Sequence, residues 1–169
     1  MAVEVERLFQ RLYPPLFRYL HRLTGDPDAA DDAAQEAFVR LTTQRLPDAE
    51  VRPWLFTVAT NLVRDRARKS ERHRRLQGNV PSATPAVAPD VSTERKERIA
   101  MVRAALERVS ERDRTMLLMR EEGFKYDEIA RAVDVAPGSV GTLLARAAKR
   151  FERAYTEQRS RETINDSSG

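Results

Sequence analysis

Apolar side chains recur every three or four residues along most of the chain, which is the spacing of one buried face of an α-helix. The first such stripe covers residues 5–23, and Pro14 and Pro15 predict a kink or a break within it. A Gly-Asp-Pro sequence at 25–27 predicts the end of that helix and the start of the next. A third helix is predicted from about residue 53 to near residue 75.

Composition changes over residues 77–93, which hold three prolines, one glycine, one acidic residue and no basic residue. Such a segment buries too little apolar surface to offset the entropy that is lost on ordering, so we predict a flexible linker. Two small helical domains are therefore expected at 1–76 and 94–157, followed by a polar, frayed tail at 158–169.

The second domain opens with an apolar stripe over residues 99–109, followed at 110–113 by Ser-Glu-Arg-Asp, which has the form of a capping box. Helices are then predicted at 126–133 and from 138 to about 155, with a turn at 135–137 between them. A short helix, a tight turn and a longer helix with a basic outer face are typical of a helix-turn-helix. No strand pattern is visible, so the predicted fold class is all-α.

Composition excludes several kinds of site. The 169 residues include no cysteine, which rules out a disulfide scaffold, a thiol nucleophile, a zinc finger and an iron–sulfur cluster. His21 and His73 are far apart in sequence, so no metal site is expected. No apolar run approaches the roughly 20 residues that cross a bilayer, and the first residues do not form a signal peptide. A soluble, cytoplasmic protein without membrane insertion is expected.

The most acidic segment is 26–36, which holds five acidic residues and no basic one. Opposite the apolar face of its helix we expect an acidic patch made of Asp31, Asp32, Gln35 and Glu36. A solvated helix N-terminus would explain Asp28, whereas acids that continue into a second turn favour docking onto a basic partner surface. Catalysis by paired carboxylates is disfavoured, because no pocket residue or metal ligand accompanies them.

A basic track follows at residues 64–75, with seven basic and two acidic residues and hence a net charge of +5. Directly before it come Trp54, Phe56, Thr57, Thr60 and Asn61. A basic helix side suits phosphates, and aromatic rings with amides suit an unstacked base. The combination favours nucleic-acid binding over a solubilising face, although Trp54 by itself is typical of a core residue.

The second helix of the predicted helix-turn-helix carries a polar face with Thr142, Ala145, Arg146, Lys149 and Arg153. Arg146 would pair with a guanine edge, Thr142 would reach a base or a phosphate, and Ala145 would contact a thymine methyl group. Helix pairs of this kind also occur in purely structural bundles, so the pattern alone leaves both interpretations open.

Together these features resemble an extracytoplasmic-function (ECF) RNA polymerase sigma factor, a short two-domain member of the bacterial primary-sigma family. The first helices of the sigma N-terminal domain are similar to LYPPLFRYLHRLTGDPDAADDAAQEAFVRL. The segment that recognises and melts the −10 promoter element is similar to PWLFTVATNLVRDRARK. The C-terminal domain that docks on the −35 element resembles LERVSERDRTMLLMREEGFKYDEIARAVDVAPGSV.

This resemblance implies a non-enzymatic factor without cofactors, which binds core RNA polymerase and promoter DNA and is held inactive by an anti-sigma partner. The β flap and the β′ clamp helices of polymerase are the implied contacts, the clamp helices through Asp31, Asp32, Gln35, Glu36 and Arg40. The implied −10 residues are Trp54, Thr57, Thr60, Asn61, Arg64, Arg66, Arg68 and Lys69, with Asn61 holding a flipped base. The implied −35 residues are Gly141, Thr142, Ala145, Arg146, Lys149 and Arg150.

The C-terminal domain departs from the family pattern at four positions. Gly141 and Leu143 stand where basic residues are usual, Ala148 replaces another basic residue, and Lys125 stands where a capping serine is usual. Each lost bidentate contact to a base removes about 1–3 kcal/mol of discrimination. We therefore predict an unusual or weaker −35 preference.

Two other functions fit parts of the sequence. The first is a helix-turn-helix regulator that binds duplex DNA as a dimer, without polymerase. Such a regulator would have no use for the melting-type segment, and the sequence of the N-terminal half shows no ligand pocket and no dimer interface. An RNA-binding or ribosome-associated protein would explain the arginine-rich helix, but it would not explain the helix-turn-helix.

Overall fold

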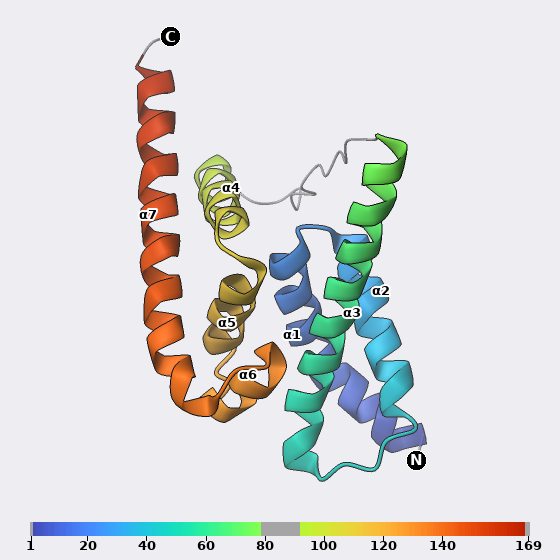
Figure 1. The fold of residues 1–169 in the computed structure, drawn as a ribbon. Coiled ribbons are helices and arrows are strands. Elements are labelled where there is room, and N and C mark those ends of the chain that lie inside the picture. The colour runs from blue at the N-terminus through green and yellow to red at the C-terminus, as the bar shows by residue number, and fades with distance from the viewer. Residues whose placement is uncertain (1, 79–91, 168–169) are drawn as a thin grey trace. The chain divides into compact units, whose positions relative to one another are not determined.

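A computed structural model describes residues 2–78 and 92–167, which form seven α-helices and one short 3₁₀ helix, with no strand among them. The chain divides into two compact units, Met1–Ala86 and Val87–Gly169 (Figure 1). Both units are helical, which confirms the predicted all-α class with two small domains. Most of the predicted linker, residues 79–91, lies outside the described residues.

The N-terminal unit consists of α1 (Ala2–Thr24), α2 (Pro27–Leu41) and α3 (Asp48–Gln77), each of which packs against the other two (Figure 1). Small side chains on α2 allow this close approach, and those with no exposed surface are Ala30, Ala33, Ala34 and Ala37. Around them, the largest fully buried side chains are Leu16, Tyr19, Leu20, Leu55 and Phe56. Burial of this apolar surface drives the packing of the three helices.

The prediction at Pro14 and Pro15 was a kink or a break, and helix α1 continues through both prolines, so a break does not occur. A proline inside a helix removes a backbone donor and costs about 3 kcal/mol relative to alanine. Leu12 precedes the prolines and Leu16 follows them, and both are buried against the other helices. Tertiary packing on both sides of the prolines therefore stabilises a helix that local preference would interrupt.

Helix α3 has a buried first half and a solvated second half. Val51, Leu55, Phe56 and Ala59 lie in the core, whereas no residue of α3 after Thr60 is buried. The helix starts at Asp48, earlier than predicted, and Pro53 lies inside it. The basic track is thus the outer half of a helix whose inner half is fixed in the core.

The C-terminal unit consists of α4 (Thr93–Arg108), α5 (Glu111–Glu121), α6 (Tyr126–Val133), a 3₁₀ turn (Pro137–Ser139) and α7 (Val140–Asp166). Helix α7 packs against α4, α5 and α6, and the succession of α6, a turn and α7 confirms the predicted helix-turn-helix. The side chains without exposed surface that join these helices include Met116, Met119, Phe124, Ile129, Val140 and Ala147.

Two expectations for this unit were wrong. Helix α7 extends to Asp166 instead of ending near residue 155, so residues 158–166 form a helix, exposed from residue 159 on, and not a frayed tail. Residues 142–166 contain no glycine or proline, so nothing in the sequence stops the helix. On α4 the predicted apolar stripe is only partly buried, because Ile99 and Val102 are exposed.

None of the helices in the described part of the chain is long and apolar enough to cross a membrane.

Candidate nucleic-acid interface

One face of α3 carries most of the predicted −10 residues. Trp54 and Thr57 are half-buried and Asn61 is exposed at the point where α3 leaves the core. Their spacing continues to Arg64 and Arg68, so all five share one side of the helix. Arg66 and Lys69 are also exposed but lie on other sides of the same helix. An aromatic ring, an amide and two guanidinium groups are therefore aligned along one exposed edge.

Thr60 does not belong to this edge, and its prediction as a DNA contact is wrong. Its side chain is fully buried. Its hydroxyl donates to the backbone carbonyl of Phe56 at 2.7 Å and shares a 2.8 Å hydrogen bond with the hydroxyl of Tyr19 on α1. The apolar spacing of α3 places this position toward the core, where Thr60 joins α3 to α1.

The charges of the basic track are only partly neutralised. Glu71 pairs with Arg74 and Arg75, and mainly the hydrogen bond from Arg74 lowers the pKa of the Glu71 carboxyl below its usual value. In contrast, Arg68 and Lys69 form no ion pair within residues 2–78 and 92–167. These two cations are available for phosphate groups.

The acidic patch lies on α2, where the structure brings its predicted residues together. The Tyr13 hydroxyl of α1 donates to Asp31, and the amide of Gln35 donates to Asp31 at 2.8 Å. Glu36 accepts a 2.9 Å hydrogen bond from Arg40, which reduces the net negative charge of the patch at that end. The residues of the patch are thus linked by hydrogen bonds along α2, and α2 packs against α3, which carries the basic track.

An ion pair joins the two surfaces. Arg66 on α3 lies 3.6 Å from the Asp32 carboxylate on α2, and both side chains are exposed. An exposed pair of this kind contributes only about 0–1 kcal/mol, so it does not hold the helices together. It does show that the acidic and basic surfaces are neighbours, which the sequence did not indicate.

An aromatic row beside the acidic patch was missed by sequence reasoning. Phe9 stacks on Tyr13 at 4.7 Å, and Tyr13 stacks on Phe17 at 6.1 Å between ring centroids. Phe38 of α2 also contacts Phe9 at 4.9 Å. The four-residue spacing of the three rings on α1 was the available signal, but it merged with the apolar stripe of the core.

In the C-terminal unit, the predicted −35 residues Thr142, Ala145, Arg146 and Lys149 are all exposed along α7. Gly141 is half-buried at the first turn, and the nearest atom to a Cβ built there would be a ring carbon of Tyr126 at 3.5 Å. That distance is an ordinary van der Waals contact, so the position accommodates a Cβ.

Tyr126, which borders Gly141, and Arg120, which lies over the Tyr126 ring, are outside the predicted set. The Tyr126 ring is 44% exposed at the start of α6. The guanidinium of Arg120, from α5, lies 5.2 Å from the centre of that ring, and it also donates to the Phe124 carbonyl at 3.1 Å. The ring that borders Gly141 therefore also carries a cation from α5. No sequence spacing links Arg120, Tyr126 and Gly141, so only the tertiary structure shows that Tyr126 contacts both other positions.

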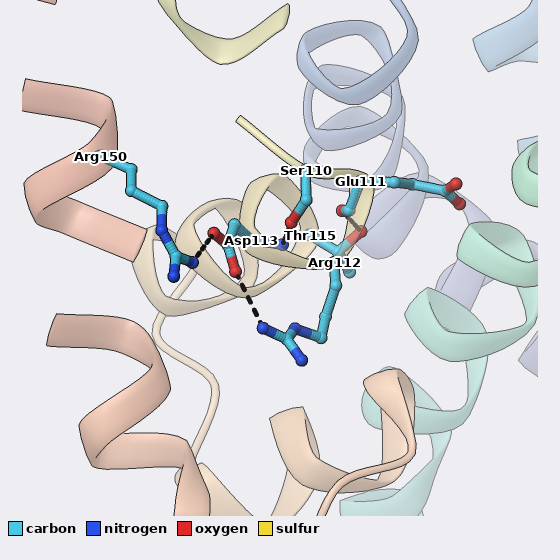
Figure 2. A network of polar contacts seen from close by, with 6 residues as sticks. All are labelled: Ser110, Glu111, Arg112, Asp113, Thr115 and Arg150. Atoms are coloured by element: carbon cyan, nitrogen blue, oxygen red, sulfur yellow. Dashed lines mark hydrogen bonds and ion pairs between the residues drawn. The ribbon is translucent and has the colours of Figure 1, made fainter. Parts of the chain in front are cut away.

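Arg150 differs from the other predicted −35 residues, because it forms an ion pair with the protein itself. Figure 2 shows its guanidinium directed at the carboxylate of Asp113 on α5, at 2.7 Å. Arg112 lies 3.5 Å from the other carboxylate oxygen, and the Asp113 side chain has no exposed surface. Ser110 caps α5 through the Asp113 amide at 3.1 Å, so only the serine half of the predicted capping box forms.

A second link from α7 lies beside this pair. Arg108 at the end of α4 donates to the backbone carbonyl of Ala154 at 3.4 Å and pairs with Glu157. This hydrogen bond from Arg108 is the main reason that the pKa of Glu157 is lowered. Together the two links border an open groove of about 330 Å³, whose lining includes Arg108, Ser110, Asp113, Arg150, Arg153 and Glu157.

The geometry defines a two-unit helical protein, with a helix whose outer half is basic in one unit and a helix-turn-helix in the other. Residues 8–73 match the model of Sigma-70 region 2, and residues 99–151 match that of Sigma-70, region 4. The ECF RNA polymerase sigma factor SigL of Mycobacterium tuberculosis is 31% identical over 162 residues, which are 92% of this chain and 91% of SigL. The chain therefore belongs to the ECF sigma factors, the RNA polymerase sigma factors that support promoter-specific transcription.

Two further comparisons agree with this assignment. The probable RNA polymerase sigma factor RfaY of Xanthomonas campestris pv. campestris is 36% identical over 136 residues; these are 74% of this chain but only 34% of RfaY. The sigma factor RpoE of Bartonella quintana, solved in complex with the anti-sigma factor NepR, has a TM-score of 0.73 at 20% identity. The match covers 90% of this chain and 97% of RpoE, and it supports the fold.

Proposed function

We propose that this chain binds core RNA polymerase through the acidic patch on α2, melts the −10 element with the exposed face of α3, and contacts the −35 element with α7. The observation that carries the proposal is the arrangement of α3. Its first half is fixed in the core, and Trp54, Asn61 and Arg68 follow one another along the side that faces solvent, with Lys69 exposed next to Arg68.

In this proposal, the −10 element melts because the chain binds the separated, single-stranded form of the DNA more favourably than the duplex. Extruding a base from the duplex costs a few kcal/mol, which stacking and hydrogen bonds to the captured base offset. Asn61 supplies an amide with both a donor and an acceptor, and the half-buried ring of Trp54 lies two turns before it on the same face. Arg68 and Lys69 then hold the phosphates of the same strand. No covalent step falls to this chain, because the polymerase performs the chemistry.

Polymerase binding rests on charge complementarity. Asp32 is 69% exposed at its side chain, and Glu36 and Gln35 lie on the same side of α2. A ridge of this sign fits basic residues on the β′ clamp helices. An anti-sigma factor that covers this ridge or the DNA-binding face would keep the factor inactive, and RpoE of Bartonella quintana was solved with such a partner. The factor would act in the cytoplasm, where polymerase works.

At the −35 element, Arg146 and Lys149 are placed to reach the major groove from α7, with Thr142 one turn earlier. Arg120, whose guanidinium lies over the Tyr126 ring that borders Gly141, would offset in part the missing basic side chain at Gly141. We therefore expect −35 binding that relies on a cation from α5 as well as on α7.

Promoter opening by reconstituted holoenzyme tests the proposal. Asn61→Ala should slow opening of duplex promoter DNA, while binding to core polymerase and the fold stay intact, because Asn61 is exposed and is not part of the acidic patch. Ser70→Ala is the matched control, since Ser70 is exposed on the opposite side of the same helix. Normal opening by Asn61→Ala would refute the assignment. Tight operator binding by the wild-type chain without polymerase would favour the helix-turn-helix regulator instead.

A further inference from the structure

We propose that Asp113 and Arg150 form a positioning pair that fixes the orientation of α7 for −35 recognition, and that Arg150 does not itself contact DNA. The inference rests on the proposed −35 role of α7. It changes the assignment of Arg150 from a DNA contact to a side chain that acts through the helix it anchors.

The first argument is the burial of the carboxylate. Asp113 has no exposed surface, although it lies in the first turn of α5 at the edge of an open groove. A carboxylate taken out of water is strongly disfavoured unless cations and donors compensate it. Arg150 supplies the shorter contact at 2.7 Å, and Arg112 supplies a longer one at 3.5 Å. Because Arg150 is the main partner, moving its guanidinium to a DNA phosphate would leave the buried Asp113 carboxylate without most of its compensating charge. Most of the desolvation cost would then be uncompensated.

The second argument is the position of Arg150 on α7. It follows Arg146 by four residues, which rotates it by about 40° around the helix axis. This rotation turns Arg150 from the exposed face of Arg146 and Lys149 toward the side that carries the buried Ala147 and Ala154. Figure 2 shows the guanidinium extended toward α5. Within one turn of α7, Arg146 would therefore face the DNA, whereas Arg150 pairs with Asp113 of the protein itself.

The third argument is that apolar contacts alone specify the rotation of α7 weakly. The buried residues of α7 are Val140, Leu144, Ala147 and Ala154. Two of these four are alanines, whose side chain is a single methyl group. Hydrophobic contact is non-directional, whereas a charged hydrogen bond has a preferred length and angle. The Asp113–Arg150 contact, with the Arg108–Glu157 pair further along, supplies this directional constraint across the groove.

The test uses reconstituted holoenzyme on promoter DNA with an intact or a substituted −35 element, over a range of salt concentrations. Arg150→Gln and Asp113→Asn should each lower the preference for the intact element about tenfold, the size of one lost base contact, and the double variant should lose no more than either. The slope of log affinity against log salt should stay unchanged in all three. Arg150→Lys, which keeps a cation near Asp113, should restore most of the preference.

Lys149→Ala is the matched control, because it removes an exposed cation from the same turn. Its salt slope should fall by about one, as expected for the loss of one phosphate contact. The inference would be overturned if the salt slope of Arg150→Gln fell by a similar amount while Asp113→Asn kept the wild-type preference for the intact −35 element. That result would show that Arg150 binds DNA. A wild-type holoenzyme that ignores the −35 substitution would instead refute the proposed function, before any variant is compared.

Discussion

Thr60→Val is the substitution that most directly separates the two sides of α3. Thr60 and Asn61 are adjacent in sequence, but the first is fully buried and the second is exposed. Valine keeps the branched shape of threonine and replaces the hydroxyl with a methyl group. The variant therefore removes the 2.8 Å hydrogen bond to Tyr19 and the 2.7 Å bond to the Phe56 carbonyl while the space stays filled.

The magnitude follows from these two bonds. The Phe56 carbonyl also accepts the regular helix hydrogen bond, so the main loss is the bond that joins α3 to α1. A neutral hydrogen bond contributes about 0.5–1.5 kcal/mol, and a buried partner left without it raises the cost. We expect a loss of about 1–2 kcal/mol in the free energy of unfolding, or roughly 5–15 °C in Tm for a unit of this size.

Hydrogen exchange of the full chain is the assay, because it reports the N-terminal unit separately. Amides of α1 and α3 should exchange faster in Thr60→Val, whereas Thr60→Ser, which keeps the hydroxyl, should stay closer to wild type. Asn61→Ala should shift stability by no more than about 0.5 kcal/mol, as exposed substitutions usually do. Unchanged protection in Thr60→Val, or impaired promoter opening at a temperature where that variant is folded, would refute the reasoning.

Three further predictions follow from the two units. Gly141→Arg should strengthen holoenzyme binding to a conventional ECF promoter, because the site accepts a Cβ 3.5 Å from Tyr126; an unchanged affinity in a titration would contradict this. Charge reversal at Asp32 and Glu36 should weaken association with core polymerase in a salt-dependent manner, and a normal affinity by light scattering would exclude the acidic patch as the docking site. The pKa of Glu157 is lowered in the fold, so its ion pair stabilises at neutral pH and is lost as pH falls below about 4.5. Thermal unfolding should therefore separate Glu157→Gln from wild type more at pH 7 than at pH 3, and an equal gap at both would show that the pair contributes no pH dependence.

Local pattern predicted the helices well where one physical preference dominated. The Gly-Asp-Pro sequence was read correctly, because Gly25 adopts a positive φ and Asp26 caps α2 through its own side chain. The same reasoning allowed a break at Pro14 and Pro15 that does not occur, because packing of α1 outweighs the local cost. It also stopped α7 too early, because polar composition was taken for fraying although no residue there ends a helix.

The sequence also predicted some residues of the candidate surfaces correctly and others not. Spacing alone placed Asn61, Arg64 and Arg68 on one side of α3, since helical periodicity depends only on the order of residues. It could not exclude Thr60, because a hydroxyl next to an exposed amide looks accessible until α1 is packed over it.

The sequence by itself therefore determined the helices, the division into two units and the sign of charge along each face, all of which depend on neighbours within a few residues. Only the tertiary structure decided which polar side chains meet across helices. It joined Asp113 to Arg150 over 37 positions of chain, and it placed Arg120 over Tyr126 beside Gly141. Such pairs depend on how helices are rotated against one another, which is set by packing of the whole unit and leaves no period in the sequence.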